Sequence, residues 1–415
     1  MTRISIPWHA WYGDRDLDLA FPEDWHVSVH PPADAPDMTG AAIEAALDAP
    51  IGSPSIEELA RATVAAGKRT VAIVVDDISR PTPAHRLMPA VIARLEAGGI
   101  DIDDVTVILA VGMHRLMTKD EMRKKLGHLA IARLDVYNGF PHGGLADYGV
   151  SSHGTPILVS RHFAEADLKI GIGSILPHGG PGFGGGAKII FPGIAGYETV
   201  KSMHEPGRLK GGLLDVDHNE LRADIEEMGR RVGLNLIINC TLTSRRGIAG
   251  VFTGDIVAAH RAGVARAREV YATRMPDAPV DIAILNAYPK DTDFLQAGLG
   301  LNVLASAAVN EPDHQVLSPE ATVVLVSASP EGRGHHALYS PTMVYGRREG
   351  DWRSSAPTID DHPIIYLSPG VTPQDARCLN TFPTWEAVLA HLAPRYASPR
   401  VAVFPCGSMQ IGVSP

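Results

Sequence analysis

The segment from His178 to His204 combines two histidines and a lysine with a dense run of glycine. Six of the eight residues 179–186 are glycine, Gly185 and Gly186 among them. Glycine permits positive φ and lets backbone amides approach an anion, so this loop could hold a phosphate. A neutral imidazole suits acid–base chemistry near pH 7 and binds nickel or zinc. Lys188 could contact a phosphate, form a Schiff base or tether a cofactor. The alternative is a tight glycine-rich turn that packs two elements together.

Known motifs do not explain this glycine-rich loop. A P-loop requires Gly-Lys-Ser/Thr, whereas Ala187 precedes Lys188 and Ile189 follows it. The glycine spacing also differs from the dinucleotide-binding fingerprint. A zinc hydrolase needs a compact set of three ligands, and no HExxH or comparable spacing occurs in the sequence.

Two further polar clusters follow predicted strands. Asp77 and Arg80 lie in a proline-rich loop, where the arginine could bind a carboxylate in bidentate fashion or simply pair with the aspartate to stabilise the turn. His114 ends another strand, and its alternative role is that of a capping or turn histidine. If His114 and His178 approached one carbon atom from opposite faces, one could remove a proton and the other return it, which is racemase chemistry.

Strands that alternate with helices must position these clusters. Ser55 with Glu58 and Thr118 with Glu121 form capping boxes, which predict helices reaching about residues 66 and 126. Further helices are expected at 84–97 and 256–271, and strands at 4–7, 70–75, 105–110, 167–172, 234–240, 281–285, 322–326 and 364–367. The pattern predicts an α/β fold with mostly parallel sheets, in which ligands bind beyond the carboxyl ends of strands.

A proline-containing segment at 274–280 predicts a linker between two α/β domains. We expect an N-terminal domain at 1–275 that carries the lysine and histidines, and a C-terminal domain at 276–399 that closes the site. Residues 400–415 are expected to pack back on the N-terminal domain. The active site would then lie in the cleft between the domains.

Composition narrows the class of protein. The chain has 415 residues, 45% of them hydrophobic and 20% charged, and a net charge of −10, which argues against general nucleic-acid binding. Its three cysteines, Cys240, Cys378 and Cys406, are too far apart for a disulfide framework or a CxxC metal site. No signal peptide and no apolar run of about 18 residues is evident, so a cytoplasmic protein without a membrane span is expected.

Together these residues resemble the lactate racemase family. The similarity runs in order through DISRPTP (77–83), GMHRLMT (112–118), Pro177-His178, GFGGGAKIIFPGI (182–194) and His204. The spacing from His178 to Lys188 to His204 is its most specific part.

The resemblance implies a nickel-pincer nucleotide, a pyridinium mononucleotide whose two sulfur-bearing arms and ring carbon hold nickel. Lys188 would form the thioamide tether to it, and His204 would supply the remaining nickel ligand. His114 and His178 would be the acid–base pair, in a proton-coupled hydride transfer through a 2-keto acid. Asp77, Gly185 and Gly186 match positions near the cofactor. Arg80 matches a position that holds the substrate carboxylate, and Gln296, in YPKDTDFLQ (288–296), matches a polar residue lining the site.

Two departures bear on the substrate. Lactate racemases proper have a lysine three residues after the position of Gln296, where this chain has Leu299, and Gly179-Gly180-Pro181 stands where relatives often have bulkier residues. We therefore expect a 2-hydroxy acid larger than or different from lactate. Cofactor-biosynthesis proteins are the expected partners, with a homo-oligomer left open. The alternative is a nucleotide- or phosphate-binding protein of the same fold without racemase activity.

Overall fold

The computed structural model describes residues 2–338, 359, 362–376 and 379–415. The chain divides into two compact units. The central unit comprises Ala35–Leu176 and Gly180–Ala267. The terminal unit comprises Met1–Asp34, Pro177–Gly179 and Arg268–Pro415, and so contains both ends of the chain.

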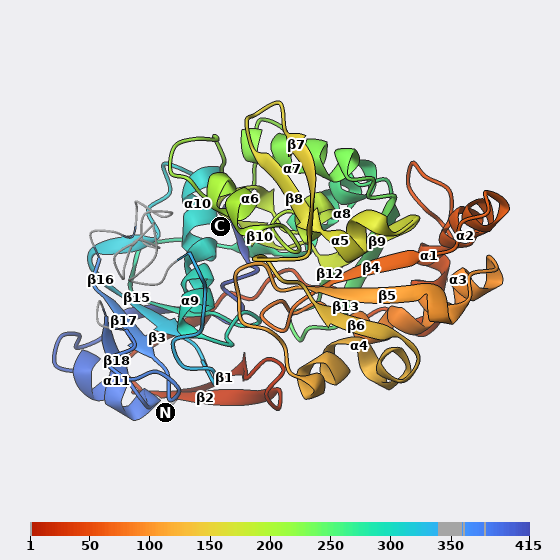
Figure 1. The fold of residues 1–415 in the computed structure, drawn as a ribbon. Coiled ribbons are helices and arrows are strands. Elements are labelled where there is room, and N and C mark those ends of the chain that lie inside the picture. The colour runs from red at the N-terminus through yellow and green to blue at the C-terminus, as the bar shows by residue number, and fades with distance from the viewer. Residues whose placement is uncertain (1, 339–358, 360–361, 377–378) are drawn as a thin grey trace. The chain divides into compact units, whose positions relative to one another are not determined.

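The central unit is built on a six-stranded sheet in the order β13-β12-β9-β4-β5-β6 (Figure 1). Its strands are β4 (Val71–Asp76), β5 (Val105–Ala110), β6 (Asp135–Asn138), β9 (Leu168–Ser174), β12 (Leu236–Leu242) and β13 (Ile248–Gly254). All neighbours are parallel except β12 and β13, which are antiparallel. Every residue of β4 and β12 is buried, as expected of parallel strands covered on both faces.

The strand order of this sheet reverses between β4 and β9. The chain proceeds outward from β4 through β5 to β6, and then returns to place β9 on the other side of β4, with β12 beyond it. The carboxyl ends on either side of such a reversal form the usual ligand-binding crevice of an open α/β sheet. The predicted clusters follow β4, β5 and β9, so three neighbouring strands present them at one edge.

Helices connect these strands, and two of them begin at the predicted capping boxes. Ser55 caps α2, and Thr118 caps α4, which continues to Arg133 through a non-helical Gly127 rather than ending near residue 126. A hairpin of β7 (Leu145–Val150) and β8 (Pro156–Ser160) is antiparallel. The remaining elements are α1 (Gly40–Leu47), α2 (Ile56–Ala65), η1 (Ala84–Arg86), α3 (Met88–Ala97), η2 (Ile102–Asp104), α4 (Lys119–Arg133), α5 (Arg161–Glu165), β11 (Gly182–Phe183), η3 (Gly186–Ile189), α6 (Tyr197–Met203), α7 (Glu220–Arg231) and α8 (Ala258–Val270).

The terminal unit contains a second six-stranded sheet, all parallel, in the order β18-β17-β16-β15-β19-β3. Its strands are β3 (His26–Val29), β15 (Val280–Asn286), β16 (Leu317–Val326), β17 (Ile364–Leu367), β18 (Asn380–Phe382) and β19 (Arg400–Phe404). The unit also holds β1 (Thr2–Trp8), β2 (Arg15–Phe21), β10 (Pro177–His178), β14 (Ala272–Arg274), α9 (Phe294–Ala297), η4 (Gly298–Leu301), α10 (Asn302–Asn310), α11 (Trp385–Leu392) and β20 (Ile411–Val413). Its order reverses between β15 and β19.

The predicted division of the chain differs from this arrangement. The C-terminal segment 400–415 was expected on the N-terminal domain, but β19 pairs with β15 and β20 pairs with β14, all within the terminal unit. The N-terminal 34 residues also belong to this unit, because β3 pairs with β19 and the β1–β2 hairpin packs on the sheet's core. Only the strand at 4–7 was predicted before Ser55, and the structure also has β2 and β3 there. Sequence separation hides these pairings from local patterns.

Two expected absences can be compared with the described residues. Neither Cys240 nor Cys406 forms a disulfide bond and both are buried, and Cys378 lies outside the part of the chain that is described. Within the described ranges, no helix combines the length and apolarity needed to span a membrane.

Candidate active site

A histidine–aspartate pair joins the ends of β4 and β5. The Nδ1–H of His114 donates to Oδ2 of Asp77 at 2.6 Å. The aspartate is 3% exposed and the imidazole 15% exposed. Because Nδ1 is used in this bond, Nε2 is the nitrogen with basic character. Burial alone would raise the pKa of Asp77, but the charges of His114 and Arg80 and the hydrogen bonds from His114 and Ser79 lower it to about 2. The carboxylate thus stays ionised and orients a base.

Ser79 links this pair to Arg80. Its hydroxyl donates to Oδ1 of Asp77 at 2.6 Å, and Nη1 of Arg80 donates to the same hydroxyl at 2.8 Å. The backbone amide of Ser79 also donates to Asp77 Oδ1, at 3.1 Å. The short loop after β4 therefore sets a guanidinium and an imidazole around one carboxylate.

A buried ion pair between Lys125 and Asp76 also holds the loop after β4. The Nζ of Lys125, which is fully buried on α4, lies 2.5 Å from Oδ1 of Asp76. The same ammonium donates to the carbonyl oxygens of Asp77 at 3.0 Å and Arg80 at 2.8 Å. Thr82 donates its hydroxyl to the other oxygen of Asp76. Lys125 thereby fixes the backbone on both sides of the loop.

The same helix also fastens the loop after β5. Glu121 completes the capping box of α4 by accepting from the amide and hydroxyl of Thr118. Its carboxylate also accepts from both terminal nitrogens of Arg115, at 2.6 and 2.9 Å. Since Arg115 follows His114 directly, α4 anchors both loops that make the His114–Asp77 pair.

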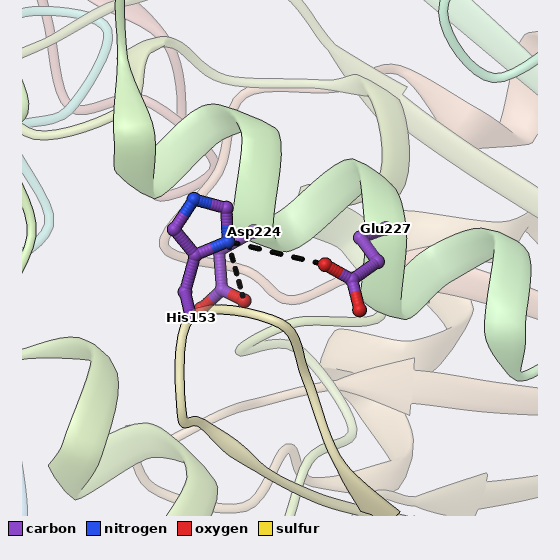
Figure 2. Close-up of side chains that lie close together, drawn as sticks. All are labelled: His153, Asp224 and Glu227. Carbon is purple, nitrogen blue, oxygen red and sulfur yellow. Dashed lines mark ion pairs between the residues drawn. The ribbon is translucent and has the colours of Figure 1, made fainter.

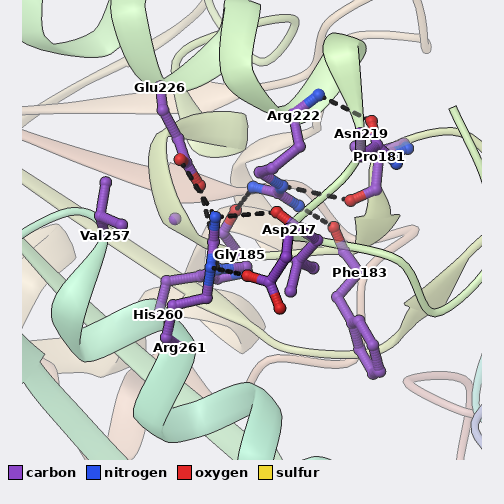
Figure 3. A network of polar contacts seen from close by, with 12 residues as sticks. Pro181, Phe183, Gly185, Asp217, Asn219, Arg222, Glu226, Val257, His260 and Arg261 are labelled. Atoms are coloured by element: carbon purple, nitrogen blue, oxygen red, sulfur yellow. Dashed lines mark hydrogen bonds and ion pairs between the residues drawn. The ribbon is translucent and has the colours of Figure 1, made fainter. Parts of the chain in front are cut away.

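Arg222 organises the glycine-rich loop from inside the central unit (Figure 3). This fully buried side chain, on α7, donates to the carbonyl oxygens of Pro181 at 3.1 Å, Phe183 and Gly185 at 3.1 Å. Burial lowers the pKa of Arg222 to about 10, which leaves it charged at neutral pH. One guanidinium therefore binds the carbonyl oxygen of every second residue from Pro181 to Gly185.

His260 holds a fourth carbonyl of that loop. Its Nε2–H donates to the carbonyl oxygen of Gly184 at 2.9 Å, so its Nδ1 can accept from Nη1 of Arg261 at 3.1 Å. Burial and the charge of Arg222 lower the pKa of His260 well below its usual range, and the ring is neutral. Arg261 is held in turn by Glu226 at 2.8 Å (Figure 3).

One amide of the glycine-rich loop is bonded within the protein. The N–H of Gly186 donates to Oδ1 of Asn239 at 2.7 Å, and the expected position of Gly185 and Gly186 near a cofactor stays a prediction. A Cβ on Gly185 would lie 2.8 Å from that same oxygen, and its φ of +76° favours glycine. A Cβ on Gly182 would lie 1.9 Å from the carbonyl oxygen of Asp215. These glycines allow close packing, and the close packing makes the loop rigid.

Lys188 follows this loop in η3 and is partly buried. Burial, and then the charges of Arg80 and Arg222, lower the pKa of Lys188 to about 7. Asp77 opposes the shift. An amine that is largely neutral at physiological pH is nucleophilic, which ordinary lysines are not. Lys188 thus lies in electrostatic range of the loop that carries Arg80 and Asp77.

His204 ends α6 and is partly buried. Its Nδ1–H donates to the carbonyl oxygen of Val200 at 2.8 Å. This bond fixes the tautomer and gives Nε2 the lone pair, the arrangement common among metal-binding histidines.

The remaining predicted residues belong to the terminal unit. His178 lies on β10 and is partly buried. Gln296 is buried on α9, where its backbone N–H donates to Oδ1 of the N-cap residue Asp293 at 2.9 Å, and Leu299 is partly buried in η4. The structure brings Asp77, Arg80, His114 and Lys188 together; the expected meeting of these groups with His178, Gln296 and Leu299 remains a prediction.

Sequence reasoning missed Lys125, Arg222 and His260. Lys125 follows Glu121 by one helical turn, and this spacing could have suggested a shared buried face. Arg222 lies in a helix so rich in charge that it resembles a solvated surface helix, and nothing local marks it as buried.

A family model and two relatives are similar to this chain. The lactate racemase N-terminal domain model matches residues 12–210. A lactate racemase of Lactiplantibacillus plantarum is 30% identical over 305 residues, covering 72% of this chain and 68% of that protein. A lactate racemase of Thermoanaerobacterium thermosaccharolyticum is 24% identical over 304 residues, covering 72% and 67%.

Solved structures share the fold. The lactate racemase apoprotein of Thermoanaerobacterium thermosaccharolyticum superposes with a TM-score of 0.75 at 20% identity, covering 99% of this chain and all of the other. A Thermotoga maritima protein gives a TM-score of 0.64 at 15% identity, covering 92% and 100%. The chain belongs to the lactate racemase family and is an isomerase of the racemase class.

Proposed function

We propose that this protein racemises or epimerises a 2-hydroxy acid other than lactate, using a nickel-pincer nucleotide tethered at Lys188. The observation that carries the proposal is the His114–Asp77 pair beside the low-pKa Lys188, on the loops that flank the strand reversal. A base, a guanidinium and a nucleophilic amine are the groups that this chemistry needs from the chain.

The residues of the central unit fit a covalently held, metal-bearing cofactor. The largely neutral amine of Lys188 can form an amide-type bond, and Nε2 of His204 has the lone pair that a nickel ligand requires. Asp77, Gly185 and Gly186 would lie near it, although Gly186 offers no amide because Asn239 accepts from it. When bound, the cofactor supplies an acceptor for the hydride at C2 of the substrate.

The chain's own residues would bind the substrate and move its proton. Arg80 would hold the substrate carboxylate through its guanidinium group. Nε2 of His114 would take the hydroxyl proton from one enantiomer, and His178 would do so for the other. Asp77 stabilises the imidazolium that forms on His114, since its carboxylate stays ionised. Exclusion of water would protect the 2-keto acid.

Leu299 supports a substrate other than lactate. An aliphatic side chain at this position, in η4, gives a pocket less polar than one with a lysine. Gly179 and Gly180 add no side-chain volume beside His178. A longer or bulkier 2-hydroxy acid, or a sugar acid, would be accommodated by both features.

A panel assay tests the proposal. The protein would be coexpressed with the cofactor-making enzymes and incubated with enantiopure 2-hydroxy acids, including lactate and sugar acids, and the products separated by chiral chromatography. We expect stereochemical inversion of at least one larger acid and a weak reaction with lactate, with His114→Asn much slower than the unaltered chain. A clear preference for lactate would refute the substrate proposal. No inversion by protein whose Lys188 carries the cofactor would favour a nucleotide-binding protein without racemase activity.

A further inference from the structure

A second cluster of potential metal ligands lies elsewhere in the central unit. His153, in the loop between β7 and β8, faces Asp224 and Glu227 on α7 (Figure 2). Its Nδ1 lies 3.7 Å from Oδ1 of Asp224 and 3.9 Å from Oε2 of Glu227. The three donor atoms all lie within 4.8 Å of one another. Two ligands at ~2.1 Å from a tetrahedral ion are about 3.4 Å apart, so these distances are close to those of a bound cation.

Asp224 gives an independent sign that a ligand belongs here. Its side chain is completely buried, and Oδ1 has no hydrogen-bond donor among the described residues. A buried carboxylate oxygen without a donor is costly, and native structures normally supply a partner. Because Oδ1 is the oxygen nearest His153, a cation at this point would satisfy it.

Neighbouring groups fix the other oxygen of Asp224. The hydroxyl of Thr155 donates to Oδ2 at 2.5 Å. Arg208 donates to that hydroxyl at 2.6 Å and to the carbonyl oxygen of His153 at 2.8 Å. Its guanidinium lies 3.9 Å from Oδ2 itself. Thr155 and Arg208 therefore orient the carboxylate and the loop of His153, as outer partners commonly orient metal ligands.

Glu227 is held in a comparable way. Its Oε1 accepts from the amide of Ser152 at 2.9 Å and from Arg231 at 2.7 Å, while Oε2 faces His153 and also accepts from the Ser152 hydroxyl. Hydrogen bonds from Ser152 hold the pKa of Glu227 below its usual range, so the ligand is a carboxylate. The positive charges of Arg208 and Arg231 weaken attraction for a cation, and we expect micromolar rather than nanomolar affinity.

We infer that His153, Asp224 and Glu227 form a structural site for a divalent first-row ion such as Zn²⁺, separate from the proposed ligand His204. One imidazole nitrogen and two carboxylate oxygens suit zinc, with water completing the coordination. The ion would fasten the β7–β8 loop to α7. His153 and Glu227 are 31% and 27% exposed, which gives the ion access from solvent.

The test uses untagged, chelator-treated protein made without the cofactor pathway, so its outcome does not depend on racemase activity. His204→Ala would serve as the background, which removes the competing imidazole. Calorimetric titration with Zn²⁺ should show one site per chain and raise the thermal midpoint. Because both side chains are partly exposed, His153→Ala and Glu227→Gln should fold, and each should weaken binding at least ~10-fold.

A matched control separates this site from general surface binding. His218, whose side chain is 93% exposed, belongs to the same unit, and His218→Ala should bind Zn²⁺ as the background does. Absence of a stoichiometric site in the background would overturn the inference. Equal affinity in His153→Ala and the background would do so too, and would leave His153 as a simple ion-pair partner of the two carboxylates.

Discussion

Each of the two six-stranded sheets contains one reversal of strand order, but the side chains that follow the strands differ between the two reversals. In the central unit, β4 and β9 lie side by side, and the loops after them carry Arg80 and Lys188, with the His114–Asp77 pair alongside. In the terminal unit, β15 and β19 lie side by side, and the segment after β15 leads to Gln296 and Leu299.

At the strand reversal of the terminal unit, polar side chains form hydrogen bonds with backbone groups. The amide of Asn286 donates to the carbonyl oxygens of Pro7 at 2.6 Å and Pro405 at 2.8 Å. Asp291 accepts from the amides of His9 at 2.8 Å and Ala10 at 3.1 Å. These contacts fasten the N-terminal hairpin and the C-terminal strand to the sheet. Similar topology thus offers a ligand position twice, and the side chains favour the central one as the place of the proposed chemistry.

Removing the amine of Lys188 should produce the largest loss. In Lys188→Ala the covalent attachment is impossible, so inversion of the best substrate should fall below detection in protein coexpressed with the cofactor pathway. Chiral chromatography measures the loss, and thermal unfolding checks the fold. Activity equal to that of the unaltered chain would assign the chemistry to another part of the molecule.

Replacing the base should slow catalysis and leave cofactor loading unchanged. In His114→Asn we expect kcat to fall by about 10²–10⁴-fold, the usual contribution of a general acid–base group. Intact mass should show the adduct at Lys188 at the level of the unaltered protein. A variant that keeps its kcat would remove His114 from the mechanism.

Breaking the buried ion pair should destabilise the central unit. Lys125→Met leaves Asp76 buried without its cation, which costs about 3–5 kcal/mol in unfolding free energy. Denaturant unfolding measures this, and the conservative Lys125→Arg should lose less if it reaches Asp76. An unchanged free energy would mean that the ammonium does not hold the loop after β4.

The reactivity of Lys188 should follow its lowered pKa. Acetylation of the cofactor-free chain should show a midpoint near pH 7, because the neutral, reactive amine becomes the major form above the pKa. The exposed Lys119 provides the control for general lysine acetylation. Peptide mapping across a pH series follows each lysine separately, and a midpoint for Lys188 far above pH 7 would contradict the low-pKa amine.

The smallest expected effect is a change in substrate preference when Leu299, in the terminal unit, is replaced. In Leu299→Lys, a restored cation should raise kcat/KM for lactate about tenfold relative to the best larger acid. Leu299→Met is the matched control, since it changes shape without adding charge. An unaltered ratio in the lysine variant would separate Leu299 from substrate choice.

Local patterns in the sequence predicted much of this fold. The strand at 105–110 and the strand at 364–367 agree with β5 and β17, and both capping boxes form as predicted. The α/β class and the clustering of Asp77, Arg80 and His114 at strand ends are confirmed. Such features depend on short-range periodicity and hydrogen bonds, which neighbouring residues determine.

Long-range pairing was beyond the reach of these patterns. The N-terminal β3 pairs with β19, more than 350 residues later, and nothing local in either strand indicates it. The role of Arg222 likewise depends on three carbonyls from a distant loop. The burial of a charged side chain depends on partners that lie far away in the sequence, so it can be explained only from the folded structure.

In the proposed function, the loops at the β4–β9 reversal hold a covalent nickel cofactor at Lys188. Intact mass, peptide mapping and nickel analysis of protein made with and without the cofactor pathway test it directly, with a lactate racemase of the family produced in parallel as the positive control. We predict an added mass on the Lys188 peptide and one nickel per chain, only with the pathway present. An unmodified, nickel-free Lys188 beside a modified control protein would contradict the claim.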